Sequence, residues 1–191
     1  VIGQTIVCLL SFVGLAAAIE VNPTPTQIQL ALDRGQQAAA QHHSPETLYH
    51  RFRGVDSGQA EGILLTKLGS LSVMAAHMAL RGLKPSAADV AHTIEAATML
   101  VSATIVGERP DFAVNSYMIL DQGGRTITPL TVRADGRADR SGTWPESQKF
   151  HAKIVAMFRY ADFDPNAKTT ITIFPAGGGE VRFLVDFAHI E

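Results

Sequence analysis

Seven histidines occur in the chain, and three of them, His42, His43 and His50, lie close together in the sequence. A zinc site needs three or four converging ligands, and two of them usually come from one helix at a spacing of three or four residues. His42 and His43 are adjacent, so their side chains diverge, and His50 lies beyond the start signal of a new helix. The chain has no H-E-x-x-H motif. We therefore predict no metal site and no resident cofactor.

The segment 162–166, Asp-Phe-Asp-Pro-Asn, resembles the first five positions of a calcium-binding loop. The sixth position is Ala167, where such a loop needs a glycine, and the twelfth is Ile173, where it needs a bidentate glutamate. The proline is typical of a tight turn between strands. A turn is therefore the preferred interpretation.

Motifs for nucleophilic catalysis and for phosphate binding are missing as well. The sequence contains no G-x-S-x-G elbow and no S-x-x-K motif. The glycines at 177–179 precede a predicted strand instead of a helix, so they indicate a hairpin tip and not a phosphate loop. Asp162, Asp164 and Asp186 fall in the predicted sheet region, but their spacing does not bring two of them together across a sugar. We predict no catalytic residues.

The most polar stretch of the chain, residues 133–140, leads into the segment that holds the single tryptophan, Trp144. Tryptophan and arginine are favoured anchors at interfaces, and loops commonly carry binding function. Arg137, Arg140 and Trp144 are therefore the candidate partner-binding residues. The alternative is a solvated loop whose tryptophan folds back over the edge of the core.

Capping signals and hydrophobic periodicity indicate the helices that precede this region. Thr24, followed by a proline and by Gln27, is a capping box and predicts a helix that runs to Ala40. Ser44 repeats the signal for a short helix to about residue 52, and Ser86 does so for a helix that reaches residue 97. An apolar stripe predicts another helix over 60–81.

After residue 98 the apolar period changes from 3.6 to 2, which predicts strands. The predicted strands are 99–106, 112–120, 125–133, 150–161, 169–174 and 180–187. With no helices between them, these strands favour an antiparallel β-sandwich. The predicted fold is α+β, with a helical region (19–97) packed as one unit with a β-sandwich region (98–191). It is immunoglobulin-like only in a broad sense, because the Cys–Trp–Cys pattern is absent.

Residues 1–18 are apolar and contain no Asp, Glu, Lys or Arg. They hold an apolar core of signal-peptide length that ends in three alanines, a pattern that signal peptidase accepts. We expect a signal peptide that is cleaved after Ala18, and a periplasmic or secreted protein. An uncleaved membrane anchor and a buried N-terminal element are the open alternatives. A lipoprotein fits less well, because Cys8 precedes most of the apolar core.

The formal net charge of −2 argues against nucleic-acid binding, which needs a clustered basic surface. Cys8 is the single cysteine, so removal of the leader leaves no thiol for disulfides or catalysis. We therefore expect an exported binding or assembly module with a protein or envelope partner, and membrane contact only if the leader is uncleaved. The alternative is an exported hydrolase whose site is assembled from scattered residues, with a metal held by histidines.

Overall fold

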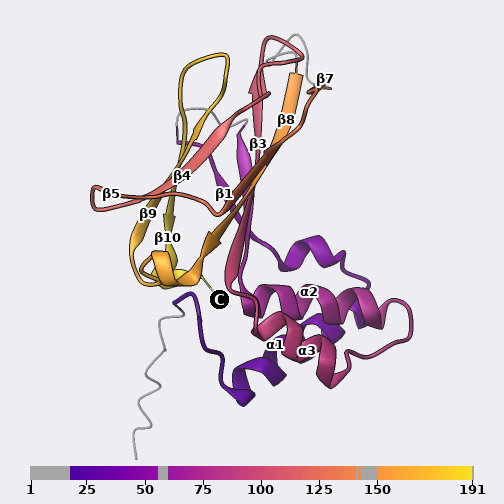
Figure 1. Ribbon diagram of the computed structural model, residues 1–191. Coiled ribbons are helices and arrows are strands. Elements are labelled where there is room, and N and C mark those ends of the chain that lie inside the picture. Colours follow the sequence, from indigo (N-terminus) through magenta and orange to yellow (C-terminus); the bar gives the residue numbers. More distant parts are fainter. Residues whose placement is uncertain (1–17, 56–59, 141, 143–149, 191) are drawn as a thin grey trace, which may run out of the picture.

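The computed structural model describes residues 18–55, 60–140, 142 and 150–190. Three helices, α1 (Pro25–Ala40), α2 (Lys67–Ala79) and α3 (Ala87–Ile94), gather at one end of the molecule, and two β-sheets form a sandwich-like pair beyond them (Figure 1). The fold is therefore α+β with the helices towards the N-terminus, as the sequence predicts. The arrangement is compatible with a broadly immunoglobulin-like sandwich but does not establish that relationship.

Every pair of neighbouring strands is antiparallel in the described part of the chain. Sheet A has, in spatial order, β1 (His50–Arg53), β2 (Glu61–Leu65), β3 (Thr98–Gly107), β8 (Phe150–Arg159) and β6 (Thr131–Ala134), while β7 (Asp139–Arg140) also pairs with β8. Sheet B has β10 (Val181–Asp186), β9 (Lys168–Phe174), β4 (Tyr117–Gln122) and β5 (Arg125–Ile127). The two sheets meet where Gly54, after β1, forms a bridge with Phe183 of β10.

The core of the sandwich is built by alternation along the strands. Every second residue along most of β8, Ile154 and Phe158 among them, is buried, while the residues between them face outward. Phe158 lies opposite Met99 of β3, and Phe183 packs edge-on against Phe52 with the ring centroids 5.0 Å apart. None of the residues in this core comes from the three helices.

The helices begin at the residues that the capping signals indicate. The capping boxes of Thr24 with Gln27 and of Ser86 with Asp89 are both present, which confirms those two predictions. Helix α2 begins after Thr66, whose hydroxyl accepts a hydrogen bond from the backbone N–H of Gly69. The predicted extension of α3 to residue 97 is wrong, because the helix ends at Ile94.

Two predictions in the N-terminal half are wrong in element type. The segment after Ser44 forms only a 3₁₀-helix, η1 (Pro45–Leu48), and then enters β1. The predicted helix over 60–81 begins with strand β2 instead. Residues 61–65 pair with β1 on one side and with β3 on the other, so sheet pairing overrides the local helical pattern. Two strands of sheet A therefore come from the region 19–97.

The strand predictions in the C-terminal half are mostly confirmed, although they omit the two-residue strand β7 and differ from the structure at two further places. Residues 112–115 form turns before β4, and Asn115 there has a φ of 60°. The predicted strand 125–133 is divided around Pro129 into β5 and β6, which belong to different sheets. Proline has no N–H for a ladder, so it suits a point where the chain leaves one sheet for the other.

Candidate binding site

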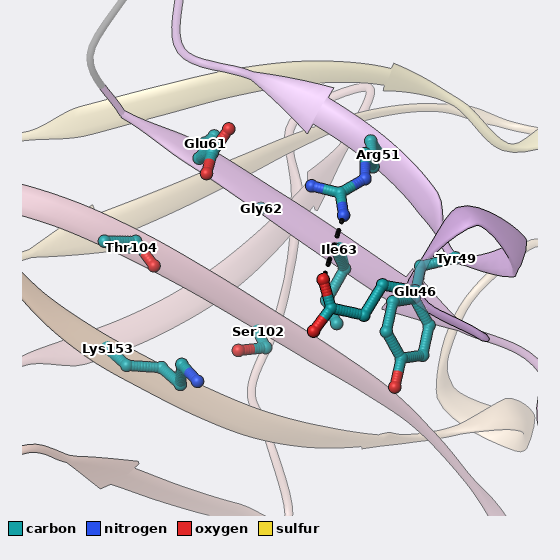
Figure 2. A pocket seen from close by; sticks show the side chains of 9 residues that line it. All are labelled: Glu46, Tyr49, Arg51, Glu61, Gly62, Ile63, Ser102, Thr104 and Lys153. Atoms are coloured by element: carbon teal, nitrogen blue, oxygen red, sulfur yellow. Dashed lines mark ion pairs between the residues drawn. The ribbon is translucent and has the colours of Figure 1, made fainter. Parts of the chain in front are cut away.

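A shallow hollow of about 260 Å³ lies on the outer face of sheet A, and we call it the sheet A groove. Its lining residues are Glu46, Tyr49, Arg51, Glu61, Gly62, Ile63, Ser102, Thr104 and Lys153. Figure 2 shows Glu46 and Tyr49 on one side of the groove, Thr104 and Lys153 on the other, and Ile63 and Ser102 between them.

Strand register places these side chains together. Glu61, Thr104 and Lys153 form one row across β2, β3 and β8. Residues directly opposite each other on paired strands point to the same face, so all three project outward from sheet A. A second row, two residues away along each strand, consists of Arg51, Ile63 and Ser102. Tyr49 and Glu46 come from η1 and its C-cap, immediately before β1.

The groove holds two carboxylates and two cations, so its formal charge is zero. Arg51 and Glu46 form an exposed ion pair with a nitrogen–oxygen distance of 3.9 Å. Glu61 and Lys153 form no ion pair within the described residues, and both side chains are exposed. Ser102 is only 8% exposed, so its hydroxyl lies at the floor of the groove.

The side chain of His50 does not face the groove. His50 and Arg51 are successive residues of β1, so their side chains point to opposite sides of the strand. Partial burial lowers the pKa of the His50 imidazole, since desolvation disfavours its charged form. The imidazole is therefore neutral near pH 7.

The groove offers hydrogen-bond donors and acceptors around Ile63 and the Ser102 hydroxyl. Lys153 and Arg51 donate, Glu61 and Glu46 accept, and the hydroxyl groups do both. Over residues 18–55, 60–140, 142 and 150–190, no three His, Cys, Asp or Glu side chains converge in a way that would hold a metal ion. The groove is thus lined by hydrogen-bonding groups of both kinds, donors and acceptors.

The structure places the predicted partner-binding residues elsewhere. Arg137 and Arg140 are exposed beside β7, at the end of the sandwich farthest from the helices (Figure 1), and neither lines the groove. Trp144 lies outside the described residues. Asp162 ends a short 3₁₀-helix, η2 (Tyr160–Asp162), and Pro165 and Asn166 form the turn that the proline indicates, in which Asp164 accepts a hydrogen bond from the backbone N–H of Asn166.

Sequence reasoning missed the groove because it assigned residues 60–65 to a helix. The sequence Glu-Gly-Ile-Leu-Leu over residues 61–65 does not alternate in polarity, so the outward position of Glu61 becomes evident only from the alternating burial along β2 in the structure. Lys153 was part of a predicted strand, but only the pairing of β8 with β3 brings it near Glu61.

No protein-family model matches the chain, and no curated protein matches it. Two solved structures match 46% of the chain at 20% sequence identity with a TM-score of 0.29. They are the archaellum periplasmic stator protein FlaG from Sulfolobus acidocaldarius and the complex of FlaF and FlaG from the same organism, of which the match covers 85% and 76% of the respective chain. A likeness this partial carries no conclusion about function.

None of the helices in the described part of the chain is both long and apolar enough to span a membrane. Of the expected leader, residues 1–18, only Ala18 belongs to the part of the chain that the structure describes.

Proposed function

We propose that the chain is an exported binding module whose sheet A groove holds an uncharged, hydroxyl-rich ligand of the cell envelope, such as a glycan. The observation that carries the proposal is the lining of the groove, where Glu61 and Lys153 have no ion-pair partner among the described residues and flank the hydroxyl groups of Ser102 and Thr104. The apolar leader, with its three alanines, supports export.

The balance of charges favours a neutral ligand. A sugar hydroxyl donates to a carboxylate and accepts from an ammonium or guanidinium group, so it satisfies both signs of charge at once. A strongly acidic or basic ligand would meet one like charge for every opposite one. Tyr49 adds an aromatic ring at the edge of the groove (Figure 2). The volume of about 260 Å³ is slightly below the ~300–1,000 Å³ of sites for drug-sized ligands, which suits a ligand of one or two rings.

Affinity is expected to be modest because the groove is open to water. The test is saturation-transfer NMR and calorimetry of the exported protein with neutral cello-, chito- and malto-oligosaccharides. Hydrogen bonds to charged groups contribute about 1.5–3 kcal/mol, so Glu61→Gln and Lys153→Gln should each weaken binding by roughly tenfold or more. Glu180→Gln and Lys168→Gln are matched controls, because both side chains are exposed and neither lines the groove.

Absence of binding to every neutral oligosaccharide would contradict the proposal, as would equal binding by the groove variants and their controls. Release of shorter sugars during the incubation would instead support the alternative of an exported hydrolase, and the same variants would then show whether the groove takes part in cleavage.

A further inference from the structure

Ile19 is the residue that would become the new N-terminus if signal peptidase cuts after Ala18. Its side chain is 1% exposed and belongs to the core of the sandwich, which also contains Phe163 and Phe187. Ala18, on the other side of the expected cut, is only partly buried. The boundary between leader and body therefore coincides with the point where the chain enters the core.

Two carbonyl groups converge on the backbone nitrogen of Ile19. This nitrogen donates to the carbonyl oxygen of Pro165 at 3.3 Å and to that of Phe187 at 3.2 Å. Pro165 lies in the turn before β9, and Phe187 begins the 3₁₀-helix η3 (Phe187–His189) after β10. Figure 1 shows the start of the described chain beside these C-terminal elements.

We infer that this pair of carbonyls is a binding site for the α-ammonium group of the processed chain, so that the mature protein begins at Ile19 with its terminus docked in the sandwich. The inference rests on the export that the proposed function includes. Hydrolysis of the Ala18–Ile19 peptide bond by signal peptidase consumes one water molecule and leaves a carboxylate on Ala18 and an amine on Ile19, which takes up a proton.

An ammonium group fits these acceptors better than an amide does. The single amide hydrogen of Ile19 is shared between two carbonyls, and the two distances lie at and just beyond the upper end of the usual range. An ammonium group has three hydrogens, so it donates one to each carbonyl and directs the third to the partly exposed position of Ala18, where water can accept it. Hydrogen bonds from a charged donor are also shorter and stronger than those from an amide.

Hydrogen bonds of Glu20 direct the chain from Ile19 towards the start of α1. One carboxylate oxygen of Glu20 accepts from the backbone N–H of Asn22 at 3.2 Å, and the other accepts from the side-chain amide of Gln27, the residue that also completes the α1 capping box. The docked terminus would thus connect the end of the sandwich to the first helix. Since Ile19 is buried, cleavage must precede folding.

The full chain, with an added initiator methionine, is produced in a bacterial host that exports proteins, and the exported form is analysed by intact mass. We expect a start at Ile19. The protein is then treated with an amine-acetylating reagent under native conditions and in concentrated denaturant. A docked α-amine should react at least about tenfold more slowly in the native protein, because it reacts only after local opening.

A variant with Gly-Gly-Ser inserted between Ala18 and Ile19 is the matched control. Its α-amine lies three residues outside the site, so it should react equally fast in both conditions, while the core around Ile19 keeps its side chains. A start at Ile19 with a freely reactive native α-amine would overturn the docking but leave export and ligand binding intact. Retention of residues 1–18, or a start at another residue, would overturn the whole inference. Failure of the oligosaccharide assay would not affect either result.

Discussion

In the sandwich, large side chains fill the space between the sheets, whereas between α1 and α2 the contact depends on side chains that are small or missing. Phe158, Phe183 and Phe187 are fully buried in the sandwich core. The facing surfaces of α1 and α2 instead bury Gly35, Ala38 and Ala39 against Ser72, Ala75 and Ala76. Gly35 lies so close to α2 that an added Cβ would overlap the carbonyl oxygen of Ser72.

The difference follows from the geometry of the two kinds of layer. Packed sheets lie ~10 Å apart, so their interior needs long side chains to fill it. Helices can approach until their backbones touch when the contact residues are small, and here the Ser72 hydroxyl donates a hydrogen bond of 2.9 Å to the Ala31 carbonyl of the neighbouring helix. Removal of buried side-chain volume should therefore destabilise the sandwich most, whereas addition of side-chain volume should destabilise the contact between α1 and α2 most.

The two regions meet at Tyr160, at the end of β8. The ammonium group of Lys67, the first residue of α2, lies 5.3 Å from the centre of the Tyr160 ring. Burial raises the pKa of the Tyr160 phenol, whose hydroxyl has no hydrogen-bond partner within the described part of the chain. The cation–π contact of Lys67 therefore joins the start of α2 to the edge of the sandwich.

The largest expected effect is that of Phe158→Ala. Removal of a fully buried phenylalanine from the central strand β8 should lower the free energy of unfolding by about 3–5 kcal/mol, because a cavity remains between the sheets. Chemical denaturation followed by circular dichroism measures this change. Phe158→Leu retains most of the volume and should cost clearly less. Equal losses for the two variants would show that volume is not what stabilises the sandwich.

Gly35→Ala tests the opposite property of the helix pair. Alanine is a better helix former than glycine by about 1 kcal/mol, yet the added Cβ would overlap the backbone of α2, so we expect a net loss of roughly 1–3 kcal/mol in unfolding free energy. The matched control is Gly69→Ala in α2, where the nearest atom to the added Cβ is the Thr66 hydroxyl oxygen at 3.3 Å. If Gly35→Ala is no more destabilising than Gly69→Ala, the close approach of α1 and α2 is wrong.

The smallest effect concerns His50, which follows η1 at the boundary between the helices and sheet A. Burial holds the pKa of His50 below its ordinary value of 6.5, so the unfolded chain binds the proton first as the pH falls. The unfolding free energy should therefore decrease as the pH falls below about 6.5, and it should do so less steeply in His50→Gln. Denaturation midpoints across pH 5–8 give both slopes, and identical slopes would contradict the predicted burial of the imidazole.

Local signals predicted the elements that are governed by local chemistry. The capping boxes at Thr24 and Ser86 predicted two helix starts. The side-chain oxygen of each N-cap residue accepts a hydrogen bond from the backbone N–H three residues later, and this contact does not depend on what the helix packs against. The glycines before β10 predicted a turn, and Gly178 and Gly179 have φ values of 91° and 83° that other residues rarely adopt. Strand β2 escaped prediction, because the two partners that pair with it lie at other places in the sequence.

The sequence by itself determined the α+β class, the order of helices before most of the strands, and the apolar character of residues 1–18, since each is a property of composition or of local periodicity. Only the tertiary structure decided that residues 61–65 form a strand, that Glu61 and Lys153 share a groove, and that two distant carbonyls meet the nitrogen of Ile19. These features depend on contacts between residues far apart in the chain. Sheet register and helix–helix distance create such contacts, and neither is encoded in any single segment.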